Sequence, residues 1–130
     1  MAPASRVLVV DDDEGLRETL GEVLTDDGFE VRVAWNGRDA LEKLDGWEPD
    51  VVILDLMMPV MDAFGFQSSL EERSRRVPPL ILLSAAPGLS SAATQLRAVA
   101  VVPKPFHLHD LLKEVHRVVQ PMNGKAPVTS

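Results

Sequence analysis

The sequence contains no cysteine, which excludes disulfides, thiolate metal sites and thiol nucleophiles. It also lacks any apolar run near the about 20 residues that span a membrane, and residues 1–10 do not have the pattern of a signal peptide. Positive charge is scarce, because 13 basic against 20 acidic side chains leave a net charge of −7. A chain this acidic is not attracted to nucleic acid phosphates or to anionic membranes. We therefore expect a small cytoplasmic domain that binds neither nucleic acid nor membrane.

The chain does contain short apolar runs that alternate with stretches of helical spacing. The runs at 7–10, 51–54 and 80–83 consist of large apolar residues without polar alternation, which is typical of central strands in a parallel sheet that is covered on both faces. The run at 31–34 alternates apolar and polar residues, as a half-exposed edge strand does. Between the runs, apolar residues recur three or four positions apart, and segment 90–97 has the weakest such pattern. The runs are residues 7–10, 31–34, 51–54, 80–83 and 99–102.

A strand followed by a helix, repeated five times, predicts an α/β fold. Right-handed crossovers make this a five-stranded parallel sheet with helices on both faces. The 130 residues have the size of one domain and contain no internal repeat or linker. We assign residues 1–120 to this domain and residues 121–130, which are poor in apolar side chains, to a flexible C-terminal tail.

Polar side chains lie just beyond four of the five runs. Asp11, Asp12 and Asp13 follow the first run, Asp55 follows the third and Ser84 the fourth, and Lys104 lies just after the fifth. Ligands of parallel α/β sheets bind beyond the carboxyl ends of the strands. We therefore expect these carboxylates, the hydroxyl and the ammonium to converge on one edge of the sheet.

Carboxylates without histidine or cysteine nearby are the ligands that Mg²⁺ prefers. A carboxylate beside Mg²⁺ and a lysine can also accept a phosphoryl group as a nucleophile. Each residue taken alone has a simpler interpretation: an aspartate after a strand is commonly a turn or cap residue, and Asp13 can cap the helix that contains Leu16. A single lysine such as Lys104 near a strand end is usually solvated, and a lone Ser84 there carries little information. The four strand ends taken together favour a binding site.

Four motifs of the chain resemble those of the receiver (CheY-like) domain of two-component response regulators. The resemblance extends from about residue 6 to residue 119 and is specific because the motifs occur together. It implies a flavodoxin-like (CheY-like) sheet with strand order 2-1-3-4-5. The motifs are Val-Leu-Val-Val-Asp-Asp (7–12), Asp-Val-Val-Ile-Leu-Asp-Leu-Met-Met-Pro (50–59) with Met61-Asp62, Ser84-Ala85, and Lys104-Pro105-Phe106.

The resemblance also implies a role for each candidate site residue. Asp55 is the expected phosphoacceptor, Ser84 the switch hydroxyl and Lys104 the ammonium that pairs with the phosphoryl group. The Lys104–Pro105 bond is expected to be cis. The three consecutive aspartates leave the register open on pattern alone, and the family arrangement selects the first two. The implied Mg²⁺ ligands are Asp12 directly, Asp11 mainly through a water, Asp55, and the backbone carbonyl of Met57.

The implied function is a signalling switch rather than a conventional enzyme. A sensor histidine kinase or phosphotransfer protein would donate a phosphoryl group to Asp55 with Mg²⁺, and the domain would then change conformation to control a protein partner. The domain could catalyse its own phosphorylation and dephosphorylation. The sequence does not specify the kinase, the pathway, the output protein or the oligomeric state, with a homodimer as one option. Nor does it tell whether the chain acts alone or belongs to a longer regulator.

Four features depart from the family pattern. Ala63 stands where a glycine is usual, which would be strained if φ there were positive. Val101 stands where an aromatic switch residue is usual. The interval of 20 residues from Ser84 to Lys104 (104 − 84) predicts a short or mobile fourth helix. Pro103 removes a backbone donor, which an edge strand tolerates.

These departures motivate an alternative function: a degenerate receiver that acts as a phosphorylation-independent interaction or dimerisation module. A third hypothesis, a phosphohydrolase, is disfavoured because Met57 stands where a second acid is needed and no residues are left for a substrate cap. Outside the site, Trp35 and Trp47 are expected at the margins between helices and sheet. The basic residues 73–76 are interpreted as a solvated helix end.

Overall fold

Each of the five apolar runs forms a strand, and a helix follows every one. The computed structural model describes residues 4–73, 75–85 and 87–119, so the predicted tail lies outside the described residues. The strands are β1 (Arg6–Val10), β2 (Glu30–Ala34), β3 (Val51–Asp55), β4 (Leu80–Ser84) and β5 (Ala100–Pro103). The helices are α1 (Glu14–Asp26), α2 (Gly37–Lys43), α3 (Ala63–Glu72), α4 (Leu89–Leu96) and α5 (Leu108–Val119).

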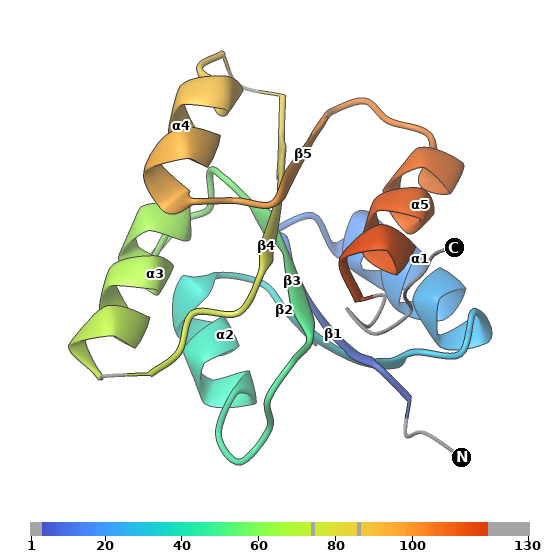
Figure 1. Ribbon diagram of the computed structural model, residues 1–130, viewed down its shortest axis with the longest axis horizontal. Coiled ribbons are helices and arrows are strands. Elements are labelled where there is room, and N and C mark those ends of the chain that lie inside the picture. Colours follow the sequence, from blue (N-terminus) through green and yellow to red (C-terminus); the bar gives the residue numbers. More distant parts are fainter. Residues whose placement is uncertain (1–3, 74, 86, 120–130) are drawn as a thin grey trace, which may run out of the picture.

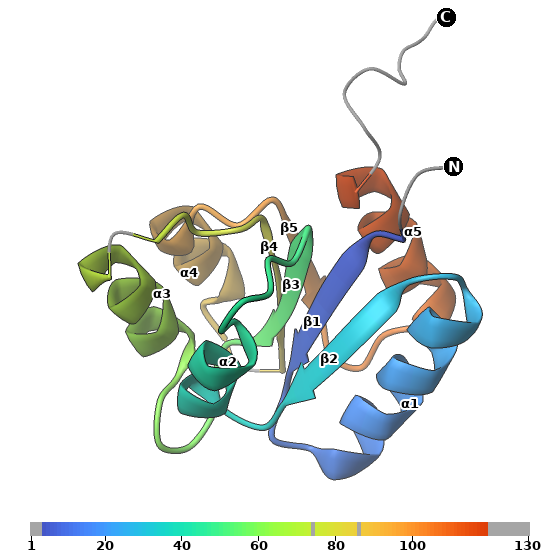
Figure 2. The same cartoon turned by 90° about the horizontal axis from the view of Figure 1, so that it is seen from below.

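The strands form one parallel sheet in the order β2-β1-β3-β4-β5, which confirms the predicted fold class. Helices α1 and α5 cover one face of the sheet, and α2, α3 and α4 cover the other (Figures 1 and 2). The strands β1, β3 and β4 lie inside the sheet and are almost fully buried, as their uninterrupted apolar sequences require. Strand β2 is an edge, as its alternating pattern predicted.

The core has one apolar cluster on each face of the sheet, because neighbouring strand residues point to opposite faces. In β3, Val52 and Leu54 pack toward α2, α3 and α4 together with Phe66, whereas Val51 and Ile53 pack toward α1 and α5. The two clusters hold the sheet rigidly between layers. This fixes the positions of the residues that follow the strands.

Strand β5 is the other edge of the sheet and accommodates Pro103, which pairs only with Ser84 of β4. Helix α4 has eight residues, so the prediction that it would be short is confirmed. Its buried side chains are Ala92 and Leu96, which explains why its apolar pattern is weak in the sequence. In the part of the chain that is described, no helix combines the length and apolar character needed to cross a membrane.

The two tryptophans differ in their surroundings. Trp47 is buried, its indole N–H donates to Glu30 at 2.8 Å, and the guanidinium of Arg32 lies 4.6 Å from the centre of its ring. Trp35 is 51% exposed, so its side chain is covered far less than that of Trp47. It directly follows the edge strand β2, where no further strand is present to cover it.

Candidate functional site

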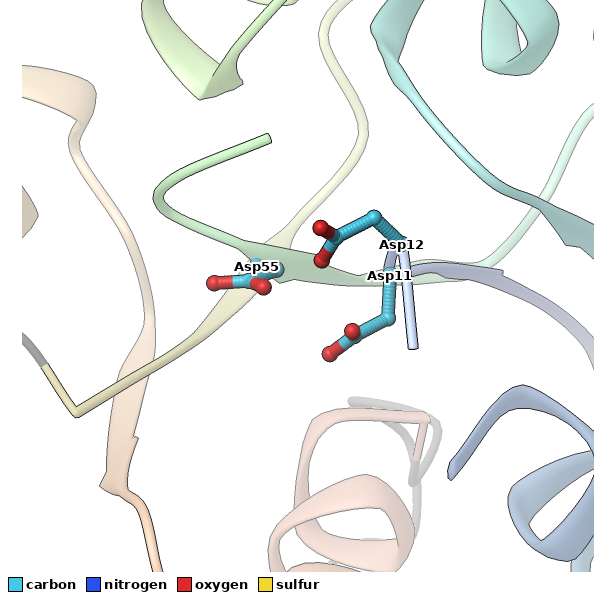
Figure 3. Close-up of side chains that lie close together, drawn as sticks. All are labelled: Asp11, Asp12 and Asp55. Carbon is cyan, nitrogen blue, oxygen red and sulfur yellow. The ribbon is translucent and has the colours of Figure 1, made fainter. Parts of the chain in front are cut away.

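The site begins with three carboxylates at the carboxyl ends of two neighbouring strands. Strands β1 and β3 pair in register, with Val10 opposite Leu54, so the residues that follow them meet. Asp11, Asp12 and Asp55 each offer a carboxylate oxygen within 4.8 Å of the others. Figure 3 shows the three side chains close together, with the carboxyl group of Asp12 extending toward Asp55. The convergence predicted from the strand ends is therefore present.

Asp13, the third of the consecutive aspartates, has a different task. It is the N-cap of α1, and its carboxylate accepts a hydrogen bond from the backbone N–H of Leu16 at 3.2 Å. Its own N–H donates to Oδ1 of Asp11 at 2.9 Å. The cluster therefore uses Asp11 and Asp12, which resolves the register that the residue pattern alone left open.

Lys104 reaches the carboxylates from the far edge of the sheet. Its Nζ lies 2.9 Å from Oδ2 of Asp11 and 3.3 Å from Oδ2 of Asp55, so one ammonium bridges both acids. The backbone N–H of Lys104 donates to the carbonyl of Ser84 at 3.0 Å, which ties the end of β5 to the end of β4. The Lys104–Pro105 peptide bond is cis, as predicted.

Burial differs sharply within the site. Asp11 is fully buried and Asp55 and Ser84 are nearly so, whereas Asp12 is exposed. Burial and the nearby charge of Asp11 raise the pKa of the Asp55 carboxyl, although the Lys104 ammonium opposes this. Burial would by itself lower the pKa of Lys104, but its hydrogen bond to Asp11 and the charges of both acids raise it. Lys104 therefore remains charged between the two buried carboxylates.

The carboxylates fit a hard divalent cation. Three negative groups face one ammonium, so the cluster keeps excess negative charge, and every donor is oxygen. Asp12 lies at the solvent-exposed side of the cluster, where an ion can enter. The backbone N–H of Met57 lies 3.3 Å from Oδ1 of Asp55, while the metal role of its carbonyl stays a prediction. This donor set suits hard divalent ions such as Mg²⁺.

Comparison with known proteins identifies the family. Residues 7–116 match the family described as the response regulator receiver domain. The chain belongs to this family. Its receiver domain is 36% identical over 117 residues to response regulator MprA of Mycolicibacterium vanbaalenii, covering 88% of this chain and 50% of that protein. It is 37% identical to regulatory protein AtoC of Escherichia coli, covering 98% of this chain and 28% of that protein. The chain thus spans half or less of these two relatives.

Solved receiver structures share the fold. Chemotaxis response regulator CheY4 of Vibrio cholerae has a TM-score of 0.78 at 34% identity, covering 88% of this chain and 98% of that chain. Response regulator TrrA of Thermotoga maritima, solved in complex with Mg²⁺ and BeF, has a TM-score of 0.75 at 32% identity, with 88% and 98% covered. Members of this family thus use Mg²⁺.

The departures of this receiver domain from the family pattern have structural explanations. Positive φ occurs at Val60 (69°) and not at Ala63, which begins α3 one residue after its N-cap Asp62. The backbone of Ala63 is therefore unstrained, and the positive φ lies at Val60, three residues earlier. Val101 is 38% exposed on β5, so a short aliphatic side chain occupies the place expected for an aromatic one.

Sequence reasoning missed two supports of the site. Arg17 donates from Nη1 to the carbonyl of Asp11 at 2.9 Å, which braces the chain where β1 leads into α1. Gly37 donates its N–H to the carbonyl of Met61 at 2.9 Å and holds the loop after β3 against α2. Neither residue belongs to a quoted motif. Arg17 reaches Asp11 from the first turns of α1, whereas Gly37 follows β2, whose carboxyl end the folded sheet places beside the loop after β3.

Proposed function

We propose that this receiver domain accepts a phosphoryl group on Asp55 from a phosphohistidine donor and then controls a protein partner. One observation carries the proposal: the Lys104 ammonium bridges the nearly buried Asp55 and the buried Asp11, with Asp12 beside them. A carboxylate held beside a cation-binding cluster and an ammonium has what phosphoryl transfer demands. The donor is a sensor histidine kinase or a phosphotransfer protein, in the cytoplasm.

Each residue has a defined task in the transfer. An oxygen of Asp55 attacks phosphorus, the new P–O bond forms as the P–N bond to the donor imidazole breaks, and the imidazole leaves. Lys104 pairs with the developing charge on a phosphoryl oxygen, and the Ser84 hydroxyl donates to another. Asp11, Asp12, Asp55 and the Met57 carbonyl would hold Mg²⁺, which would neutralise charge on the phosphoryl oxygens.

The surroundings of the site give a donor protein access. A groove of about 680 Å³ lies between the start of α1 and the segment that joins β5 to α5, and Lys104 is part of its wall. Its apolar lining includes Leu16, Phe106 and Leu108. A donor segment seated there approaches the acidic cluster directly.

Labelling with a small phosphodonor tests the proposal. Acetyl phosphate with Mg²⁺ should add one phosphoryl group, observed by intact-protein mass spectrometry, and Asp55→Asn should abolish the addition. Asp13→Asn is the matched control, because it removes a neighbouring carboxylate while asparagine still caps α1, and it should keep the label. Retention of the label by Asp55→Asn would count decisively against Asp55 as acceptor.

The alternative is a receiver that binds its partner without phosphorylation. The exposed Val99 and Val101 on the β5 side favour it, because an apolar surface can dock a partner whether or not Asp55 is phosphorylated. In addition, Val101 replaces the aromatic residue that would couple this surface to the site. A pulldown with and without beryllofluoride and Mg²⁺ separates the two functions. Equal recovery of the partner supports the alternative, and recovery that depends on beryllofluoride supports the switch.

A further inference from the structure

A second groove lies away from the phosphoacceptor site, between α1 and the edge strand β2. It has a volume of about 760 Å³, and Val31 and Val33 contribute apolar side chains to it. Figure 2 shows α1 alongside β2 at the end of the sheet, where no further strand follows. The groove near Lys104 uses different residues of α1, among them Leu16 and Thr19. The α1–β2 groove is thus a separate surface.

One wall of the α1–β2 groove is acidic along its whole length. Glu14, Glu18, Glu22 and Asp26 recur every four residues along α1, all are exposed, and all line the groove. Within the described residues, none of the four forms an ion pair or hydrogen bond through its side chain. Like charges at this spacing destabilise a helix by a few tenths of a kcal/mol per pair, roughly 0.2–0.5. Apart from Glu14, which lies in the first turn where the helix dipole favours an acid, the stripe therefore has no evident stabilising role inside this chain.

Arg17, the cation among the groove residues, does not neutralise this stripe. Its guanidinium is engaged with the carbonyl of Asp11 at 2.9 Å, and it forms no ion pair with the acids of α1 within the described residues. The acidic side chains of α1 are therefore available to bind a ligand from outside the chain. A cationic ligand satisfies them.

Gly21 keeps the middle of the groove open. A glycine inside a helix is less favourable than alanine by about 1 kcal/mol. A Cβ at Gly21 would meet only Cγ1 of Val33, at an ordinary contact distance of 3.6 Å, so internal packing does not require glycine here. Without a side chain at Gly21, Val33 remains 37% exposed beneath α1. The missing side chain leaves room for one from a partner.

We propose that the α1–β2 groove docks a basic segment of a partner protein. Lysine or arginine side chains of the segment lie against Glu18, Glu22 and Asp26, and an apolar side chain of the segment packs on Val33 across Gly21. A second copy of this chain is the less suitable occupant, because each copy carries a net charge of −7 and the two repel. The same charge excludes an anionic membrane or a nucleic acid.

A synthetic peptide that repeats lysines, with leucines three and four residues apart, probes the groove. Titration at physiological ionic strength, followed by amide chemical shifts of the labelled full chain, should perturb α1 and β2. Glu18→Gln with Glu22→Gln should weaken binding about tenfold, since two charge contacts are lost. The control Glu71→Gln with Glu72→Gln removes the same charge from the exposed end of α3 and should change affinity less than twofold.

Gly21→Leu provides a second test that does not alter charge. Its side chain covers Val33, so binding should fall about tenfold while thermal unfolding stays cooperative and labelling of Asp55 is unchanged. Equal weakening by both glutamine pairs would overturn the proposal, because it would mean diffuse attraction to an acidic protein. Shifts confined to other elements, or self-association detected by light scattering on mixing, would overturn it as well.

Discussion

At the scale of single residues, one amino acid serves three purposes at consecutive positions. Asp11 is fully buried against Lys104, Asp12 is exposed beside the cluster, and Asp13 caps α1. The difference arises because the chain leaves β1 and turns into a helix within these residues. The effect of a carboxylate on stability should therefore depend on its position in the fold. Asp55 and Glu30 allow this to be tested, because the fold raises the pKa of the first and lowers that of the second.

Asp55→Asn should stabilise the fold at neutral pH. The pKa of Asp55 is raised in the folded state, mainly by burial, so ionisation opposes folding above the ordinary pKa of an aspartate. The penalty is present at neutral pH and disappears as the pH falls below about 4, the unfolded value. Thermal unfolding without divalent ions should give a higher Tm for the variant at pH 7 than for wild type. The difference should shrink toward zero in acid, and a variant less stable at pH 7 would contradict the burial argument.

Glu30→Gln should have the opposite dependence on pH. The hydrogen bond from the Trp47 indole, assisted by Arg6 and Arg32, lowers the pKa of Glu30 despite some desolvation. A lowered folded pKa means that the carboxylate stabilises the fold above its unfolded pKa and loses this effect as the pH falls through the folded value. Denaturant unfolding should show a less stable variant at pH 7 and convergence with wild type in acid. Glu48→Gln, an exposed glutamate nearby, serves as the control and should show no such trend.

Val60→Gly should stabilise the loop that follows β3. Val60 is at φ 69°, in a three-residue turn that the Met61 N–H closes onto the carbonyl of Pro59 at 2.7 Å. A β-branched residue there is strained by roughly 1–2 kcal/mol, which exceeds the unfolded-state entropy that glycine adds. A gain of about 1 kcal/mol in the free energy of unfolding is expected, because the side chain is 67% exposed and loses little packing.

The control for this substitution is Val99→Gly. Val99 is also exposed and its φ lies outside the left-handed region. Glycine there should lower the free energy of unfolding by about 0.5–1 kcal/mol. If both substitutions destabilise the protein equally, the turn at Val60 is not strained.

The convergence of the candidate site residues could be predicted from the sequence, but the contacts that support them could not. Asp55, Ser84 and Lys104 lie immediately after apolar runs, so a parallel sheet alone brings them to one edge. The strained backbone at Val60 and the hydrogen bond from Arg17 to the Asp11 carbonyl depend on the conformations of the segments that connect strands and helices. Loop paths follow from packing around the finished sheet, and short-range sequence patterns do not encode them.

At the scale of elements, α2 and the loop after β3 are packed backbone to backbone. The Gly37 N–H donates to the carbonyl of Met61, and a Cβ at Gly37 would lie 2.7 Å from that oxygen and 2.7 Å from Cγ of Met61. The loop that follows Asp55 can thus lie directly against α2, because Gly37 has no side chain that would keep the two backbones apart. Short-range sequence patterns do not reveal this contact, because Met61 lies 24 residues after Gly37 (61 − 37).

Gly37→Ala should therefore destabilise the protein by about 1–3 kcal/mol through overpacking against backbone that cannot retreat freely. Equilibrium urea unfolding measures the loss. Gly15→Ala is the matched control in the first turn of α1, where a Cβ meets only Oδ1 of Asp13 at 3.5 Å, and it should be neutral or slightly stabilising. Equal stability of the two variants would mean that the α2 contact yields without strain.

At the scale of the whole molecule, the order of the strands creates the charge imbalance of the site. Strands β1 and β3 are neighbours, so their acids meet. Strand β5 is separated from β1 by β3 and β4, and it contributes one lysine across that span. Three carboxylates and one ammonium are held by a sheet that is buried on both faces. The folded chain therefore repels itself locally unless a cation is present, and the unfolded chain does not.

Mg²⁺ should accordingly raise the Tm of the whole domain. An ion that binds only the folded state stabilises it by about 2.7 kcal/mol at 100 times its dissociation constant. The rise should not occur with sodium chloride of equal ionic strength, because general screening does not replace a bound divalent ion. Asp12→Asn should lose most of the response, since it removes the exposed member of the cluster, and Asp13→Asn should retain it because that carboxylate only caps α1. A response that survives in Asp12→Asn but disappears in Asp13→Asn would place the ion on the cap side of α1 and would refute the assignment of the cluster.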